Sequence, residues 1–125
     1  MIGYVTLGTN QIDKAAAFYD SVLATIGAQR FMEMDGFVAW SRLPGGTGLC
    51  IARPSDGLPA SVGNGTMAAI QAVSKEEVEK LHAKALELGA QDEGAVGYRG
   101  DSFYAGYFRD LDGNKLNVFY MPEPE

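Results

Sequence analysis

The sequence predicts an α+β fold of two tandem βαβββ modules, with eight strands in a curled mixed sheet around a central cavity and helices outside. Three observations support this fold class. A strand-like alternation followed by helical spacing occurs twice, both predicted helices end in Gly-Ala-Gln, and the two tripeptides lie 62 residues apart. A single period of roughly 60 residues indicates one duplicated supersecondary unit. We expect modules at residues 1–61 and 62–125, which together form one structural domain.

The first module begins with an alternating segment, GYVTLGT at residues 3–9, which is typical of a half-buried strand. Helical spacing of apolar residues follows and predicts a helix from about residue 11. Asn10 is the expected N-cap of this helix, and Gly27 is expected to end it. We expect about three more strands between this glycine and Pro54.

The second module repeats this order. TMAAIQAV at residues 66–73 predicts a strand, and Ser74 with Glu77 has the spacing of a capping box at the start of a second helix, which Gly89 ends. Residues 37–54 can be laid on residues 103–122. This alignment places Ala39 over Ala105 and Cys50 over Asn117.

Strand parity separates two sets of side chains, because neighbours along a strand point to opposite faces. The apolar set is expected to face the helices: Val5, Leu7, Leu49, Ile51, Ala68, Ile70, Leu116 and Val118. The opposite set is mixed in polarity and is expected to line a cavity between the modules: Tyr4, Thr6, Cys50, Ala52, Met67, Ala69, Asn117 and Phe119. We therefore expect the Asn117 amide to point into a pocket.

Composition excludes several classes of partner. The net charge of −6 opposes binding to nucleic acid phosphates or anionic lipid, and it favours a neutral or cationic ligand. Cys50 is the single cysteine, so no intramolecular disulfide can form and a reducing compartment is favoured. The N-terminal residues lack the pattern of a signal peptide. We expect a cytoplasmic protein with no nucleic acid or membrane partner.

The combination of three segments resembles the vicinal oxygen chelate superfamily, which includes glyoxalase I, bleomycin-resistance proteins, fosfomycin-resistance enzymes and extradiol dioxygenases. The segments are VTLGTNQIDKAAAFYDSVL, the Gly-Thr-Met at residues 65–67, and FRDLDGNKLNVF. The resemblance covers nearly the whole chain. It implies paired βαβββ modules that close into a barrel-like sheet, usually in a homodimer.

In metal-using relatives, each module supplies one ligand from its first strand and one from its last. Carried over, these positions fall on Tyr4, Cys50, Met67 and Asn117. The family normally has His, Gln or Glu there, and none of these four residues is histidine or a carboxylate. Divalent ions that act as Lewis acids prefer imidazole or carboxylate donors. We therefore expect no catalytic metal and no cofactor.

Other residues have two interpretations. Trp40, Tyr104, Tyr107 and Phe119 lie on predicted strands, where they form core or line the cavity. Arg53 and Arg99 are either solvated or hold an anionic ligand group. The glycines at 94, 97 and 100 favour a mobile flap around Arg99. His82 is expected to be a solvated residue on the helix surface, and Cys50 a packing residue rather than a nucleophile.

The functional expectation is a small-molecule binding protein of this family without a catalytic metal. The expected cavity residues are Tyr4, Thr6, Trp40, Cys50, Met67, Arg99, Tyr104, Tyr107, Asn117 and Phe119. The alternative is a metal-dependent enzyme, either a glyoxalase I-like lyase of the lactoylglutathione lyase type or an extradiol dioxygenase type. The sequence leaves the identity of the ligand and the occurrence of catalysis open.

Overall fold

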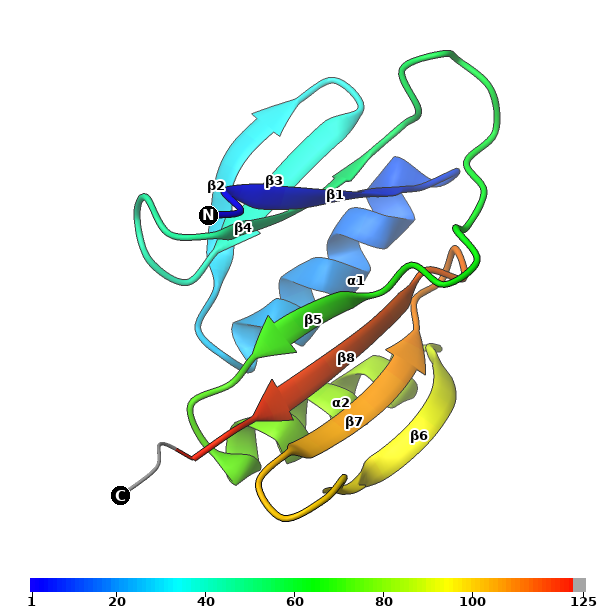
Figure 1. Ribbon diagram of the computed structural model, residues 1–125. Coiled ribbons are helices and arrows are strands. Elements are labelled where there is room, and N and C mark those ends of the chain that lie inside the picture. The colour runs from blue at the N-terminus through cyan, green and yellow to red at the C-terminus, as the bar shows by residue number, and fades with distance from the viewer. Residues whose placement is uncertain (123–125) are drawn as a thin grey trace.

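The computed structural model describes residues 1–122 and contains two βαβββ units (Figure 1). The first unit comprises β1 (Tyr4–Gly8), α1 (Ile12–Ala24), β2 (Gln29–Met34), β3 (Phe37–Ser41) and β4 (Gly48–Ala52). The second comprises β5 (Ala68–Gln71), α2 (Lys75–Glu87), β6 (Gln91–Tyr98), β7 (Tyr104–Arg109) and β8 (Lys115–Tyr120). The connection between the two units is residues 53–67. No helix within the described residues is long and apolar enough to cross a membrane.

Each unit forms a four-stranded mixed sheet, with strand orders β1-β4-β3-β2 and β5-β8-β7-β6. The first strand of each unit pairs in parallel with the last, and the remaining pairs are antiparallel. The predicted α+β fold of eight strands and two helices is confirmed, with the strands divided equally between two sheets.

Strand register makes Cys50 and Asn117 equivalent. Thr6 pairs with Cys50 between β1 and β4, and Ala69 pairs with Asn117 between β5 and β8. The alignment of Ala39 with Ala105 is wrong by two residues, because Ala39 pairs with Cys50 whereas Tyr107 pairs with Asn117. The predicted alignment followed the identity of the two alanines. The residue pairs between β3 and β4 and between β7 and β8 show which residues of the two units are equivalent.

The parity prediction holds for the core. Leu7, Ile51, Ala68, Leu116 and Val118 are buried in the cluster that the helices cover, and Leu49 and Ile70 pack against it. Val5 is an exception, since 36% of it remains exposed. Both helices lie behind the sheets in Figure 1. We call the opposite face of each sheet its open face.

The predicted helix ends are confirmed at three of four positions. Ser74 Oγ accepts a hydrogen bond from the Glu77 backbone N–H at 3.2 Å. Gly27 and Gly89 follow the two helices with φ of 78° and 105°, values that glycine adopts without strain. Asn10 does not cap α1, which begins without a side-chain cap.

Asn10 instead holds the connection between the units. Its Oδ1 accepts from the backbone N–H of Ala60 at 2.7 Å, and its Nδ2 donates to the Ala60 carbonyl at 3.2 Å. The Asn10 side chain points toward this loop and is therefore not available to cap α1.

His82 is buried, so the prediction of a solvated histidine is wrong. Only 5% of it is exposed, and its Nε2 lies 3.1 Å from the Tyr107 carbonyl oxygen and 3.3 Å from Asp92 Oδ1. The ring fits because β7 has glycine opposite it: a Cβ on Gly106 would lie 2.8 Å from His82 Cδ2. The helical spacing of His82 gave no sign of this distant glycine.

The first unit fills the same region differently. Its helix has Asp20 at the position of His82, counted back from each Gly-Ala-Gln, and Asp20 Oδ1 accepts from the Trp40 indole N–H at 2.9 Å. By register, Val38 and Trp40 correspond to Gly106 and Phe108. The first unit thus places more side-chain volume on the strand, and the second places more on the helix.

A buried carboxylate joins the two units. Asp110, which is 6% exposed, lies in the turn between β7 and β8, and its Oδ2 accepts from the Tyr19 hydroxyl of α1 at 2.6 Å. Its Oδ1 accepts from the backbone N–H groups of Asp112 and Asn114, each at 2.9 Å. Asn114 Nδ2 donates both to Asp110 Oδ2 at 3.0 Å and to the Gly8 carbonyl at 2.9 Å. The turn of the second unit is therefore bonded to both α1 and β1 of the first.

We predict that Asp110→Ala lowers the free energy of unfolding by about 3 kcal/mol or more, because four donors at the junction lose their acceptor. Urea denaturation followed by circular dichroism measures this. The control is Asp35→Ala, whose side chain is 98% exposed in the β2–β3 turn and which should change stability little. Equal effects of the two substitutions would contradict a structural role for Asp110.

The Tyr19–Asp110 pair also predicts a pH dependence. Burial, followed by the charge of Asp110, raises the pKa of Tyr19 well above its ordinary value of 10.0. The folded state therefore keeps the phenol proton that the unfolded chain releases. This contribution to stability is complete below about pH 10 and is lost as the pH rises further. Tyr19→Phe should lose less stability than the native chain in urea titrations between about pH 9 and about pH 11, and equal losses would contradict the prediction.

Candidate functional site

The open face of the second sheet carries a buried amide at its centre. Asn117 on β8 is 1% exposed, with Tyr107 of β7 on one side and Ala69 of β5 on the other. Its Oδ1 has no hydrogen-bond partner, and it is the one buried side-chain oxygen or nitrogen in residues 1–122 of which this is true. The amide thus lies on the expected face, and its oxygen has no hydrogen-bond partner.

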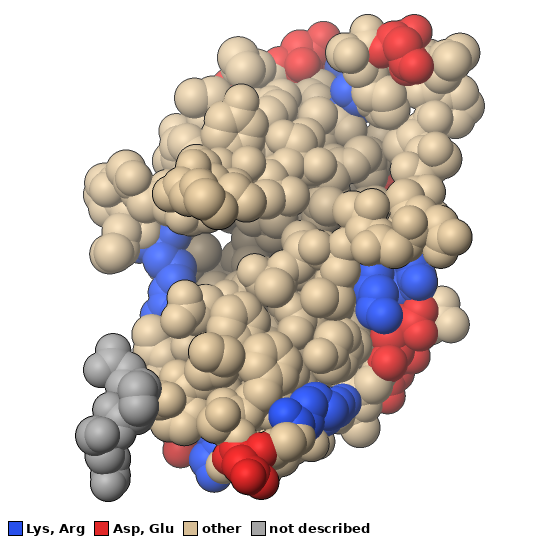
Figure 2. Space-filling model, viewed as in Figure 1, with Lys and Arg blue, Asp and Glu red and all other residues tan. Residues whose placement is uncertain are grey.

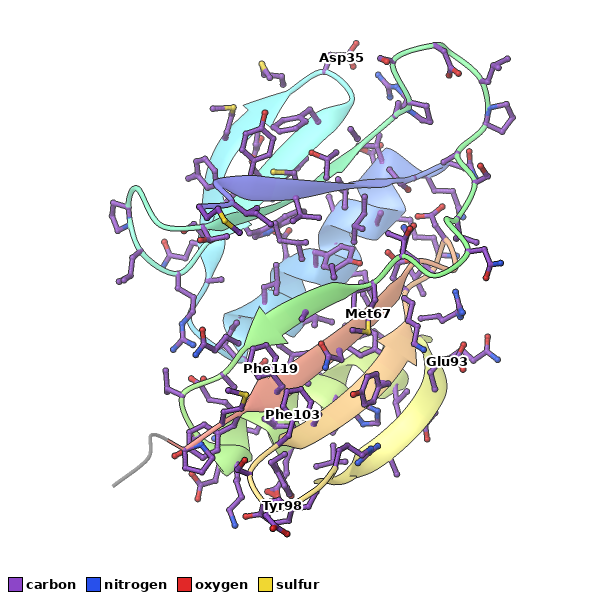
Figure 3. All side chains as sticks on the ribbon, in the orientation of Figure 1. Asp35, Met67, Glu93, Tyr98, Phe103 and Phe119 are labelled. Carbon is purple, nitrogen blue, oxygen red and sulfur yellow. The ribbon has the colours of Figure 1, made fainter. Side chains whose placement is uncertain are left out.

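Aromatic and thioether groups flank the amide. Phe119 stacks on Phe103 with ring centroids 5.3 Å apart and an interplanar angle of 12°. Met67, immediately before β5, is 43% exposed. Figure 3 shows these three side chains along the same sheet. Phe103 was absent from the predicted site because it precedes β7, outside the strand pattern.

Two cations lie against the Tyr107 ring. The Arg99 guanidinium carbon is 5.3 Å from the ring centroid and the Lys115 Nζ is 5.7 Å from it. Lys115 was not among the predicted site residues, although it has the same strand parity as Asn117 and Phe119. The alternation of side chains along β8 could have identified Lys115 as a site residue.

The predicted flap around Arg99 is wrong, because Gly94 and Gly97 belong to β6 and pair with β7. Both glycines instead make room for the arginine: Cβ atoms on them would lie 3.2 Å and 3.5 Å from its nitrogens. Arg99 donates to the carbonyls of Ala95 at 2.7 Å, Gly97 at 2.9 Å and Ala105 at 3.3 Å. The guanidinium is therefore fixed on the sheet.

The open face of the first sheet holds Tyr4, Thr6 and Cys50. Tyr4 is 63% exposed, whereas Cys50 is buried. Burial raises the pKa of the Cys50 thiol, and a hydrogen bond with Thr6 offsets this only in part. The thiol is thus disfavoured as a nucleophile, in agreement with its expected packing role.

Three predicted residues lie away from these faces. Trp40 is in the core beside α1, and the Tyr104 hydroxyl points to α2, where it donates to Glu79 Oε2 at 2.7 Å. Arg53 pairs with Asp35 at 2.8 Å in the first unit. The structure therefore does not bring Trp40, Tyr104 or Arg53 together with Asn117.

A cavity of about 690 Å³ lies between the two units. Figure 2 shows the hollow between the two halves of the molecule. Residues of both units line it, and of the predicted site residues only Trp40 and Phe119 are among them. A second cavity of about 500 Å³ lies beside residues 62–67 and is also lined by Arg109 and Lys115.

The four positions at which the family resemblance places metal ligands do not fit a hard dication. Tyr4 and Cys50 lie on one sheet, whereas Asn117 lies on the other and Met67 immediately precedes β5 of that sheet. They offer a phenol, a thiol with a raised pKa, a thioether and an amide, whereas Lewis-acid ions prefer imidazole and carboxylate donors. Across residues 1–122, no three His, Cys, Asp or Glu side chains are grouped so that they could hold a metal ion.

Comparisons with known proteins agree with this fold. Residues 1–118 match the family model described as the Glyoxalase/Bleomycin resistance protein/Dioxygenase superfamily. The crystal structure of a glyoxalase/bleomycin resistance protein from Albidiferax ferrireducens T118 is 30% identical, with a TM-score of 0.90 over 98% of this chain and 99% of that one. No protein among the curated ones matches significantly.

Two more distant structures share the fold. A glyoxalase/bleomycin resistance protein/dioxygenase family enzyme from Burkholderia phytofirmans PsJN is 18% identical, with a TM-score of 0.74 over 96% of this chain and 98% of that one. A lactoylglutathione lyase from Agrobacterium tumefaciens is 22% identical, with a TM-score of 0.70 over 96% and 92% of the two chains. With the family model matched from residue 1 to residue 118, this chain belongs to the glyoxalase/bleomycin resistance protein/dioxygenase superfamily.

Proposed function

We propose that the protein binds a small organic molecule on the open face of its second sheet and holds it without a catalytic metal. The observation that carries this proposal is the Asn117 amide, which is buried and has no partner for its oxygen. A buried polar atom without a hydrogen bond costs about 1–3 kcal/mol. A ligand that donates to this atom recovers that cost on binding.

Access to the amide requires a neighbouring side chain to move, because Asn117 is almost fully covered. Met67 is suited to this movement. It lies just before β5, beside the strand that carries Asn117, and 43% of it is exposed. An unbranched thioether changes rotamer readily and adapts to the shape of a bound molecule.

The donor set supports binding without metal. Family membership also suggests a glyoxalase I-like lyase or an enzyme of the extradiol dioxygenase type. Either enzyme needs a Lewis acid at the positions of Tyr4, Cys50, Met67 and Asn117. A neutral phenol, a protonated thiol, a thioether and an amide bind such an ion weakly. Met67 and Asn117, the two of these residues that belong to the second unit, are instead suited to contact an organic ligand.

We also propose a homodimer located in the cytoplasm, by likeness to the family. The open face of the first sheet supports the dimer, because it exposes large apolar residues that a second copy would cover: Tyr4, Phe31, Met32 and Met34. Each of these four is at least 44% exposed in the single chain.

Metal binding is tested by titrating purified, chelator-treated protein with nickel, zinc, iron(II) and manganese in a calorimeter, together with elemental analysis. We predict no stoichiometric uptake, because the donors are soft or neutral. One equivalent of metal per chain, lost in Cys50→Ser or Asn117→Ala, would refute the proposal and favour the enzyme.

The role of the amide is tested by comparing two asparagines on either side of the start of β8. Asn114→Ala removes two hydrogen bonds, at 2.9 and 3.0 Å, and should lower the free energy of unfolding by about 2 kcal/mol. Asn117→Ala removes an amide whose oxygen has no hydrogen-bond partner within residues 1–122, and it should cost less than about 1 kcal/mol. A loss above about 2 kcal/mol for Asn117→Ala in urea denaturation would show that the amide is structural.

A further inference from the structure

We infer that the ligand of this site carries an oxyanion, a carboxylate or a phosphate group, which is held by the uncompensated cations beside Tyr107, Arg99 and Lys115. This inference rests on the proposed function, since it names the class of molecule that the open face would bind. Its basis is a pair of cations without carboxylate partners, both against the ring of Tyr107, which is the strand neighbour of Asn117. The unpartnered Asn117 oxygen is an acceptor, so it takes a donor group of the same ligand and not the oxyanion.

Arg99 differs from the other arginines in its charge environment. The chain has five arginines, and four of them, Arg30, Arg42, Arg53 and Arg109, form ion pairs with carboxylates. Arg99 forms none within residues 1–122 and binds only backbone carbonyls. Its positive charge is therefore left uncompensated on the sheet.

The Arg99 guanidinium is also positioned before any ligand binds. Three of its N–H groups donate to carbonyls, so two of the five N–H donors of an arginine side chain remain. The glycines at 94 and 97 leave the space in which it lies. Because its position is fixed before binding, little side-chain entropy is lost when an oxyanion accepts from the remaining donors.

Lys115 places a second positive charge against the same ring. Its ammonium makes no hydrogen bond or ion pair within the described part of the chain, and it lines the cavity of about 500 Å³ beside residues 62–67. The next cation on this face, Arg109, is neutralised by Glu93. Two like charges near one ring repel each other, and a bound anion offsets that repulsion.

These cations outweigh the net charge of −6 at short range. Exposed charges more than about 10 Å away are largely screened at physiological ionic strength, whereas a contact with Arg99 or Lys115 is not. The expectation of a neutral or cationic ligand, which came from the net charge alone, therefore does not describe this face. The stacked Phe103 and Phe119 supply a nearby surface for an apolar or aromatic body.

The test uses four probes of similar size that differ in charge: benzoate, phenyl phosphate, benzamide and benzylammonium. Each is titrated into ¹⁵N-labelled full-length protein at fixed ionic strength and followed by NMR. The side-chain NH₂ signals of Asn117 are assigned by their loss in Asn117→Ala. We expect benzoate or phenyl phosphate to shift these signals and to bind at least about tenfold more tightly than benzamide, with benzylammonium weakest.

Charge variants then locate the oxyanion. Lys115→Gln removes a charge that makes no structural bond within residues 1–122, so the fold is expected to persist. It should weaken benzoate by about tenfold and leave benzamide unchanged. Arg53→Gln, which removes a cation that is already paired in the first unit, is the matched control and should change neither.

The outcomes separate the two proposals. If benzamide binds as tightly as benzoate and shifts Asn117, the oxyanion inference is overturned while the proposed function stands. If an anion binds and Lys115→Gln weakens it, but the Asn117 signals do not move, the anion site stands and the role of the amide is overturned. If no probe shifts any signal of Asn117, Tyr107 or Lys115, both are refuted.

Discussion

The position of one unit against the other depends on the Asp110 carboxylate. It lies in the turn that precedes β8, it accepts four hydrogen bonds, and one of them comes from Tyr19 on the helix of the other unit. Because β8 begins only five residues after Asp110, this contact also fixes where the strand with Lys115 and Asn117 starts. The geometry of the open face is therefore coupled to the contact that joins the two units.

The second sheet combines a rigid frame with unused binding capacity. Arg99 is fastened by three carbonyls, Tyr107 lies under two cations, and the Asn117 amide between the strands has no partner for its oxygen. A protein interior normally satisfies such groups. Where a chain leaves an amide and two charges unpaired on one face, the missing partner is best supplied from outside the chain.

The sequence predicted those features that follow from local periodicity. The repeat, the strand parity and the placement of Asn117 opposite the apolar face needed only the spacing of residues along one segment. The misses came from pairs distant in sequence. His82 is buried because Gly106 lacks a side chain 24 residues later, and the glycines of β6 looked like a flap because nothing local revealed their pairing with β7. For Trp40 and Tyr104 the sequence indicated only that they are aromatic residues in strands. This does not decide which face of the sheet their side chains lie on.

The two halves differ in whether the helix or the facing strand carries the larger side chains, and this difference bears on how the halves have diverged. After a duplication both halves begin identical, and each later change of volume must be matched by its neighbour across the helix–sheet boundary. Here one half pairs Asp20 with Trp40, and the other pairs His82 with Gly106 and Phe108. Each helix is now complementary only to its own sheet. A chimera in which α1 and α2 trade places would overfill one half and leave a void in the other, so the two helices are not interchangeable.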